Sequence, residues 1–93
     1  MHLSSTALRA FEALRGTERE RVRQALRRLA VDVARPGRIG GKASKTIHGP
    51  EGSFHRLRVG DLRIMYDVIT DDRVVLILGI VHRGDLERWL RAR

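Results

Sequence analysis

The spacing of apolar residues changes partway along this chain, and that change constrains the fold more than any other feature. Before Pro36-Gly37 the apolar residues recur at intervals of three and four, as on one face of an α-helix. From Phe54 onward they alternate with polar residues, which is the period of a β-strand. Helices followed by short strands are typical of the α+β class, in which helices lie on one face of an antiparallel sheet.

Two amphipathic helices are predicted in the first third of the chain. The first ends near Gly16, a residue suited to a helix C-terminus. Thr17 and Glu20 have the spacing of a capping box, which would open a second helix that ends at Pro36-Gly37. The short connection predicts a helical hairpin with one shared apolar face. Its two stripes are Ala7, Leu8, Phe11 and Leu14, and Val22, Ala25, Leu26, Leu29, Ala30 and Val33.

The second half predicts a three-stranded meander. Residues 54–59, 62–69 and 74–81 are strand-like and are joined by tight connections at 60–61 and 70–73. Residues 37–53 have glycines, a proline and little periodicity, which predicts a basic loop. Gly84-Asp85 opens a short last helix, with Leu86, Trp89 and Leu90 on one side. Together these elements predict a single domain that spans residues 1–93.

Strand alternation separates the two faces of this predicted sheet. The apolar face should receive the hairpin. The opposite face carries Arg56, Arg58 and Arg63, with Arg83 just beyond the last strand, and Gly79 should leave backbone open there to a ligand. The predicted apolar face consists of His55, Leu57, Val59, Leu62, Ile64, Tyr66, Val68, Val74, Leu76, Leu78 and Ile80.

Positive charge is the main compositional signal. Lys and Arg number 19 against 11 Asp and Glu, and all but Lys42 and Lys45 are arginine. This excess predicts attraction to polyanions such as nucleic acid. Guanidinium groups bind phosphate oxygens in pairs, and only Asp67 opposes the arginines on the predicted open face. The alternative is a solvated basic surface without a ligand.

Two histidines are candidates for moving a proton. His82 ends the last strand beside Arg83, and His55 begins the first strand, where a packing role is the alternative. The chain has no cysteine and no histidine or carboxylate spacing typical of a metal site, so neither a metal nor a cofactor is expected. It also lacks an apolar run of about 18 residues and a signal-peptide pattern. These features predict a cytoplasmic protein without membrane contact.

Three segments carry a resemblance to a known family: residues 55–66, which surround the Gly60-Asp61 turn, residues 80–86, and the first helix at residues 6–14. In these segments the sequence resembles the RelE/ParE superfamily of bacterial toxins. The resemblance implies a helical hairpin on a small antiparallel sheet and a cognate antitoxin as partner. It also implies that Arg63 and Arg83 match functional arginines of RelE-like enzymes, and that Arg56 and Arg58 approximately match the basic positions before them.

Two departures from the family pattern have consequences. The family usually opens with a strand, and here only Met1-His2-Leu3 precedes Ser4, so the strand should be missing or vestigial and a sheet edge free for a partner. The tyrosine that commonly follows the closing arginine is absent. Trp89 lies near that position and could stack on a base, although anchoring of the last helix is the alternative.

The function predicted from this resemblance is that of a type II toxin, a metal-independent mRNA endoribonuclease that acts on the ribosome and inhibits translation. The 2′-hydroxyl of the RNA would attack the adjacent phosphate, and Arg63 and Arg83 would hold that phosphate. His82 or His55 would move the proton, with an arginine or lysine, as the resemblance implies, as the alternative. The RNA backbone would be bound by Lys42, Lys45, Arg56 and Arg58. The alternative is a ParE-like toxin that inhibits DNA gyrase by binding it.

Overall fold

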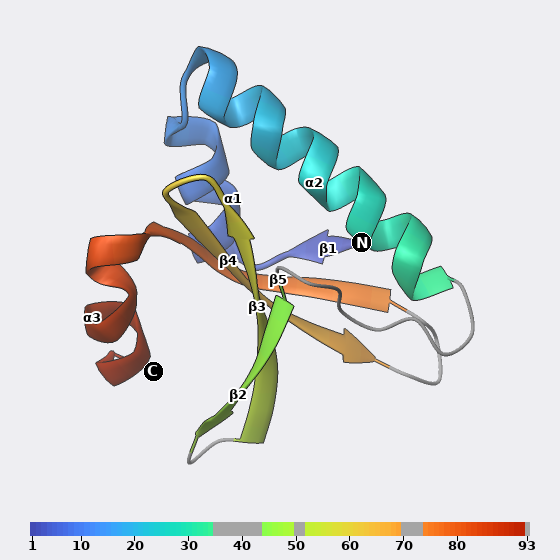
Figure 1. Cartoon of the computed structure of the whole chain (residues 1–93), viewed down its shortest axis with the longest axis vertical. Helices are drawn as coiled ribbons and strands as arrows, with labels where there is room; N and C mark the ends of the chain where they lie inside the picture. The colour runs from blue at the N-terminus through green and yellow to red at the C-terminus, as the bar shows by residue number, and fades with distance from the viewer. Residues whose placement is uncertain (35–43, 50–51, 70–73, 93) are drawn as a thin grey trace.

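The protein, described by a computed structural model over residues 1–34, 44–49, 52–69 and 74–92, forms a five-stranded sheet with helices against both faces (Figure 1). The strand order is β1-β5-β4-β3-β2, and only the β1–β5 pair is parallel. The elements in chain order are β1 (His2–Leu3), α1 (Ser5–Ala13), α2 (Gly16–Ala34), β2 (Ser44–Gly49), β3 (Gly52–Val59), β4 (Leu62–Ile69), β5 (Val74–His82), the 3₁₀ turn η1 (Arg83–Asp85) and α3 (Leu86–Arg91).

The predicted helical hairpin is confirmed. Ser4 caps α1, since its Oγ accepts a hydrogen bond from the N–H of Ala7 at 3.1 Å. Gly16 stands at the bend between the helices with a φ of +50°, a conformation that glycine adopts without strain. The predicted capping box is wrong, because α2 already includes Thr17, and Glu20 instead accepts a hydrogen bond from Nη1 of Arg23 at 2.9 Å.

The hairpin and one face of the sheet enclose the main hydrophobic core. Most of the predicted stripes are buried there, and burial of this apolar surface is the main force that holds the hairpin on the sheet. Leu8 is an exception with 47% of its surface exposed, and Ala30 is also exposed. The buried members of the core are Ala7, Leu14, Val22, Leu26, Leu29, Val33, Leu62, Ile64, Tyr66, Val75, Ile77 and Ile80.

A β-bulge in β5 changes which residues of that strand face the core. Met65 pairs with Gly79, but its neighbour Tyr66 pairs with Ile77, so Leu78 is an extra residue in the ladder. A one-residue shift exchanges the two faces of a strand. The prediction of Val74, Leu76 and Leu78 in the core is therefore wrong, because Val75 and Ile77 take their place; Ile80, beyond the bulge, is buried as predicted.

Part of the predicted basic loop is a strand. Residues 44–49 form β2, which pairs antiparallel with β3 from Ser44↔Leu57 to Gly49↔Gly52. This segment is a strand because it forms hydrogen bonds with β3, although its own sequence lacks the alternation of a strand. Gly52 and Ser53 belong to β3, and the other residues of the predicted loop, 37–43 and 50–51, lie outside the described residues.

The first strand is vestigial, but it covers the edge that the sequence predicted to be free. His2 pairs with Leu76 and Leu3 with Ile77, and the N–H of Ser4 then donates to the carbonyl of Ile77 at 2.9 Å. Ser4 also donates through its Oγ to the carbonyl of Leu78 at 3.0 Å. The prediction of a free edge is therefore wrong along this part of β5.

The last helix lies on the sheet face opposite the hairpin, not on the same face as predicted (Figure 1). Trp89 of α3 packs over Gly79 of β5 and makes an edge-on contact with Phe54 of β3, with 5.7 Å between the ring centroids. Phe54 and Met65, both on this face, are buried outside the main core. The second face is thus apolar beneath α3, and its arginines are left at one end.

Candidate nucleic-acid interface

Four arginines lie close together near the end of β3, the start of β4 and the end of β5, on the sheet face that also carries α3. Arg58 and Arg63 are paired across the β3–β4 ladder, Arg56 lies two residues earlier on the same face, and Arg83 follows the end of β5. Because these strands are paired without a shift between residues 55 and 66, strand alternation places the three strand arginines together. Arg56, Arg58, Arg63 and Arg83 are called the arginine cluster below.

The members of the cluster act on one another electrostatically. Burial lowers the pKa of Arg63, and the positive charges of Arg56, Arg58 and Arg83 lower it further, while Asp61 raises it. Such mutual repulsion means that the cluster has more positive charge than its protein neighbours neutralise. An anion bound between these side chains would relieve the repulsion, and this makes the cluster a candidate phosphate site.

The Gly60-Asp61 turn holds two members of the cluster. Gly60 has a φ of +59°, which lets the turn close in two residues. Nη1 of Arg63 donates to the carbonyl oxygens of Gly60 at 3.0 Å and Leu62 at 2.9 Å. Arg83 donates its backbone N–H to the carbonyl of Asp61 at 2.8 Å, and its Nε lies 3.8 Å from Oδ1 of the same residue. One turn therefore anchors both arginines that carry the family resemblance.

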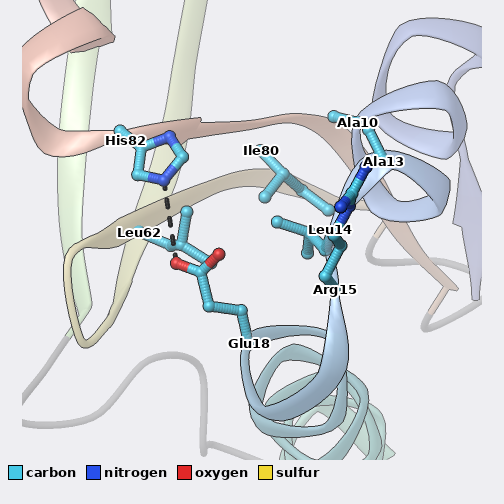
Figure 2. Close-up of a pocket in the computed structure, with 8 residues that line it drawn as sticks. All are labelled: Ala10, Ala13, Leu14, Arg15, Glu18, Leu62, Ile80 and His82. Atoms are coloured by element: carbon cyan, nitrogen blue, oxygen red, sulfur yellow. Dashed lines mark ion pairs between the residues drawn. The ribbon is translucent and has the colours of Figure 1, made fainter.

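His82 lies on the other face of the sheet, at the mouth of a pocket beside the hairpin. Its Nε2 is 3.7 Å from Oε2 of Glu18 in α2, and Figure 2 shows the two side chains facing each other. Leu62, the register partner of His82, is buried in the hairpin core, which fixes this orientation. The pocket has a volume of about 380 Å³ and is lined by Ala10, Ala13, Leu14, Arg15, Glu18, Leu62, Ile80 and His82.

His55 is also on the hairpin face. It pairs with Tyr66 across β3 and β4, and the two rings stack with centroids 5.1 Å apart and an interplanar angle of 28°. The structure therefore does not bring either histidine together with the arginine cluster. Among the described residues, no group of three His, Asp or Glu side chains could hold a metal ion.

The remaining predicted binding residues have different outcomes. Trp89 covers Gly79, so the backbone that was expected to be open to a ligand is filled by an indole ring, and the prediction for Gly79 is wrong. Lys45 belongs to β2, where it pairs in register with Arg56. Lys42 lies outside the described residues.

Sequence reasoning missed two residues at the cluster. Asp61 belongs to the turn signal but also contacts Arg83. Arg21 of α2 is exposed, and its Nη1 lies 3.8 Å from the point where a Cβ on Gly60 would stand. The sequence gives no signal for Arg21, because it is one of several arginines on a polar helix face and only the packing of α2 brings it near the turn.

Comparison with solved structures shows which proteins share this fold. The fold matches RelE in the RelB–RelE antitoxin–toxin complex of Methanococcus jannaschii, with a TM-score of 0.72, 18% identity, and coverage of 96% of this chain and 98% of the other. The RelE–RelB complex of Pyrococcus horikoshii gives a TM-score of 0.69 with 21% identity over 89% and 92% of the two chains. The toxin–antitoxin complex RelBE2 of Mycobacterium tuberculosis gives a TM-score of 0.59 with 25% identity, over 88% of this chain and 94% of the other.

The family follows from the sequence comparison. Residues 2–87 match the model of a protein family that is described as the ParE toxin of the type II toxin–antitoxin system parDE. The chain therefore belongs to the ParE toxin family within the RelE/ParE superfamily, and it is a toxin of a type II toxin–antitoxin system. No curated protein matches the chain at the level of sequence. None of the described helices is long and apolar enough to cross a membrane.

Proposed function

We propose that this toxin is a metal-independent endoribonuclease that cuts messenger RNA on the ribosome, and that the arginine cluster binds the scissile phosphate. The observation that carries the proposal is the placement of four arginines together on one sheet face, where Arg58 and Arg63 pair across β3 and β4 and Arg83 follows the end of β5. Asp61 contacts this cluster, but one carboxylate does not neutralise four guanidinium groups. An excess of guanidinium groups around one point suits the binding of a phosphate.

The reaction is an in-line attack within the RNA chain. The 2′-oxygen forms a bond to the adjacent phosphorus, and the bond from phosphorus to the 5′-oxygen breaks. The products are a 2′,3′-cyclic phosphate and a 5′-hydroxyl, while the proton of the 2′-hydroxyl passes to solvent and the leaving oxygen takes one up. Negative charge on the phosphorane oxygens rises along this path, and fixed cations directed at those oxygens lower the barrier.

The toxin lowers the barrier of this reaction by stabilising charge rather than by moving protons. Arg63 and Arg83 bind the reacting phosphate, and Arg56 and Arg58 bind the RNA backbone beside it. His82 contacts Glu18 and His55 stacks on Tyr66, both on the hairpin face, so neither histidine is given the proton transfer that the sequence predicted. The field of the cluster itself favours the ionised form of the attacking 2′-oxygen, since a nearby positive charge lowers the pKa of an acidic group.

Expression without an antitoxin followed by mapping of RNA 5′ ends tests the proposal. We expect growth arrest and new 5′-hydroxyl ends inside translated codons, and none in cells treated first with an inhibitor of translation initiation. An Arg63→Ala variant expressed to the same level is the control. Growth arrest without new RNA ends would overturn the proposal.

A second function is favoured by one observation, the match of the chain to the ParE toxin family. In that case the toxin would bind DNA gyrase and cut no RNA. The same cells distinguish the two functions, because gyrase poisoning produces DNA breaks covalently linked to gyrase and leaves messenger RNA intact.

The proposed partner that neutralises the toxin is a cognate antitoxin, as in the RelB–RelE complexes whose toxins share this fold. The toxin has a formal net charge of +8, which favours an acidic antitoxin, and the proposed compartment for both is the cytoplasm. A partner that binds only the folded toxin raises its melting temperature. An acidic protein encoded beside the gene should therefore raise the melting temperature and restore growth, and failure to do either would exclude it as the antitoxin.

A further inference from the structure

Asp61 contacts Arg83 through both its backbone and its side chain. The carbonyl oxygen of Asp61 accepts the backbone N–H of Arg83 at 2.8 Å, which fixes the main chain where β5 passes into η1. Oδ1 of Asp61 lies 3.8 Å from Nε of Arg83, so the carboxylate faces one particular edge of the guanidinium. The two residues are far apart in sequence, and the antiparallel pairing of β4 with β5, which joins Leu62 to His82, brings them together.

A guanidinium group is planar and offers two edges that can hold an anion in a bidentate manner. One edge consists of Nε and one terminal nitrogen, and the other consists of the two terminal nitrogens. Since Asp61 faces Nε, the edge formed by Nη1 and Nη2 is directed away from the carboxylate. We propose that Asp61 is a positioning residue, which holds the Nε edge of Arg83 and thereby presents its terminal nitrogens to a phosphate.

A purely structural explanation of this pair is weak. Both side chains are largely exposed, at 71% for Arg83 and 75% for Asp61, and exposed ion pairs contribute little to stability. The backbone hydrogen bond already joins the turn to the end of β5 without the carboxylate. Arg83 still has several freely rotating bonds, however, and a nearby negative charge restricts them. The pair therefore does more for the direction of the side chain than for the fold.

Asp61 also has an electrostatic cost for anion binding. It opposes the arginine cluster, as its effect on the pKa of Arg63 shows. Removal of this negative charge should make the cluster more attractive to any polyanion and at the same time leave Arg83 less well directed. Binding and turnover should therefore change in opposite directions, which a loss of folding could not produce.

The first experiment needs no activity. In NMR spectra of the free toxin, the Nε–Hε signal of Arg83, assigned by its disappearance in Arg83→Lys, should shift and exchange faster with water in Asp61→Asn. In Asp61→Glu the position and the exchange rate of this signal should be close to those of the wild type. Asp85→Asn is the matched control, because Asp85 has a similar exposed contact with Arg88 at 3.9 Å outside the cluster. An unchanged Arg83 signal in Asp61→Asn would overturn the inference.

The second experiment rests on the proposed ribonuclease function. With the purified toxin and programmed ribosomes, Asp61→Asn should lower kcat by about two- to fivefold, the most that the loss of an exposed ion pair can change the direction of Arg83. It should tighten binding of a single-stranded RNA blocked by 2′-O-methyl groups by about two- to fivefold, as expected for one surface charge removed. The drop in kcat should be absent in the Arg83→Ala background and should be partly rescued by Asp61→Glu.

The two proposals fail in distinguishable ways. If the wild-type toxin cuts no RNA, the proposed function is overturned, and the positioning role of Asp61 stands or falls with the NMR measurement and the binding of the blocked RNA. If the wild type cuts RNA but Asp61→Asn cuts as fast, the positioning role is overturned and the ribonuclease function stands. Equal losses in Asp61→Asn with and without Arg83 would also count against a role through Arg83.

Discussion

The indole of Trp89 occupies the space beside Gly79 where the side chain of any other residue would begin. A Cβ on Gly79 would collide with Nε1 of Trp89, because it would stand closer than a Cβ approaches a non-bonded atom in folded proteins. Gly79 pairs with Met65, which is fully buried on the face that α3 covers. The contact between Trp89 and Gly79 fixes α3 on the sheet, and the arginine cluster lies beside α3 on the same face.

Gly79→Ala should therefore destabilise the toxin by about 1–3 kcal/mol, the usual cost of forcing extra atoms into a packed site. Urea unfolding measures this change. The effect should be much smaller in a Trp89→Ala background, because the two residues touch and their effects are not additive. Gly84→Ala is the control, since a Cβ there meets nothing within 4 Å. Equal destabilisation by the two glycine variants would show that the contact with Trp89 is not the cause.

Replacement of Arg63 or Arg83 by alanine should abolish growth arrest and leave the fold intact. We expect the free energy of unfolding to change by less than about 1 kcal/mol, because relief of repulsion offsets the loss of exposed hydrogen bonds. Lysine at either position should also impair the toxin, since an ammonium group lacks the bidentate fork. Growth assays at matched expression and thermal unfolding measure the two effects. Arg88→Ala, on α3 and 83% exposed, is the control and should remain toxic.

The affinity for single-stranded RNA should fall steeply with salt. A variant that binds one phosphate fewer should have a slope of log affinity against log salt that is shallower by about 0.7. We therefore expect this change for Arg56→Ala and for Arg58→Ala, and a smaller one for Arg21→Ala, which lies at the border of the cluster near Gly60. Fluorescence anisotropy at several salt concentrations gives the slopes. An affinity that does not depend on salt would argue for a protein target.

His82→Ala should leave most of the activity in place, because the side chain faces Glu18 on the hairpin side of the sheet. Its loss should change the free energy of unfolding by no more than about 1 kcal/mol, as for other exposed ion pairs. The measurement is the pH dependence of the cleavage rate, whose shape should match that of the wild type. A loss of about a hundredfold or more, the usual contribution of a general acid or base, would restore His82 as the residue that moves the proton.

Local periodicity was sufficient to predict the hairpin and the meander. The apolar stripes of α1 and α2 and the alternation in β3 and β4 each specify one buried face, and in both strands the residues predicted to meet the hairpin do so. The same alternation placed Arg56, Arg58 and Arg63 together, because β3 and β4 are joined by a two-residue turn that leaves no freedom in their register. These features depend on interactions between residues close in the chain.

The sequence by itself thus determined the α+β class, the hairpin and the common face of the strand arginines. Only the tertiary structure decided which residues of β5 are buried, because the bulge at Leu78 depends on pairing with β4 and on the contact with Ser4. It also decided that residues 44–49 form a strand, that α3 covers Gly79, and that His82 lies away from the arginines, whereas His55 was already on the predicted apolar face. Each of these outcomes is set by pairing or packing between two elements of the fold, which no local pattern of side chains encodes.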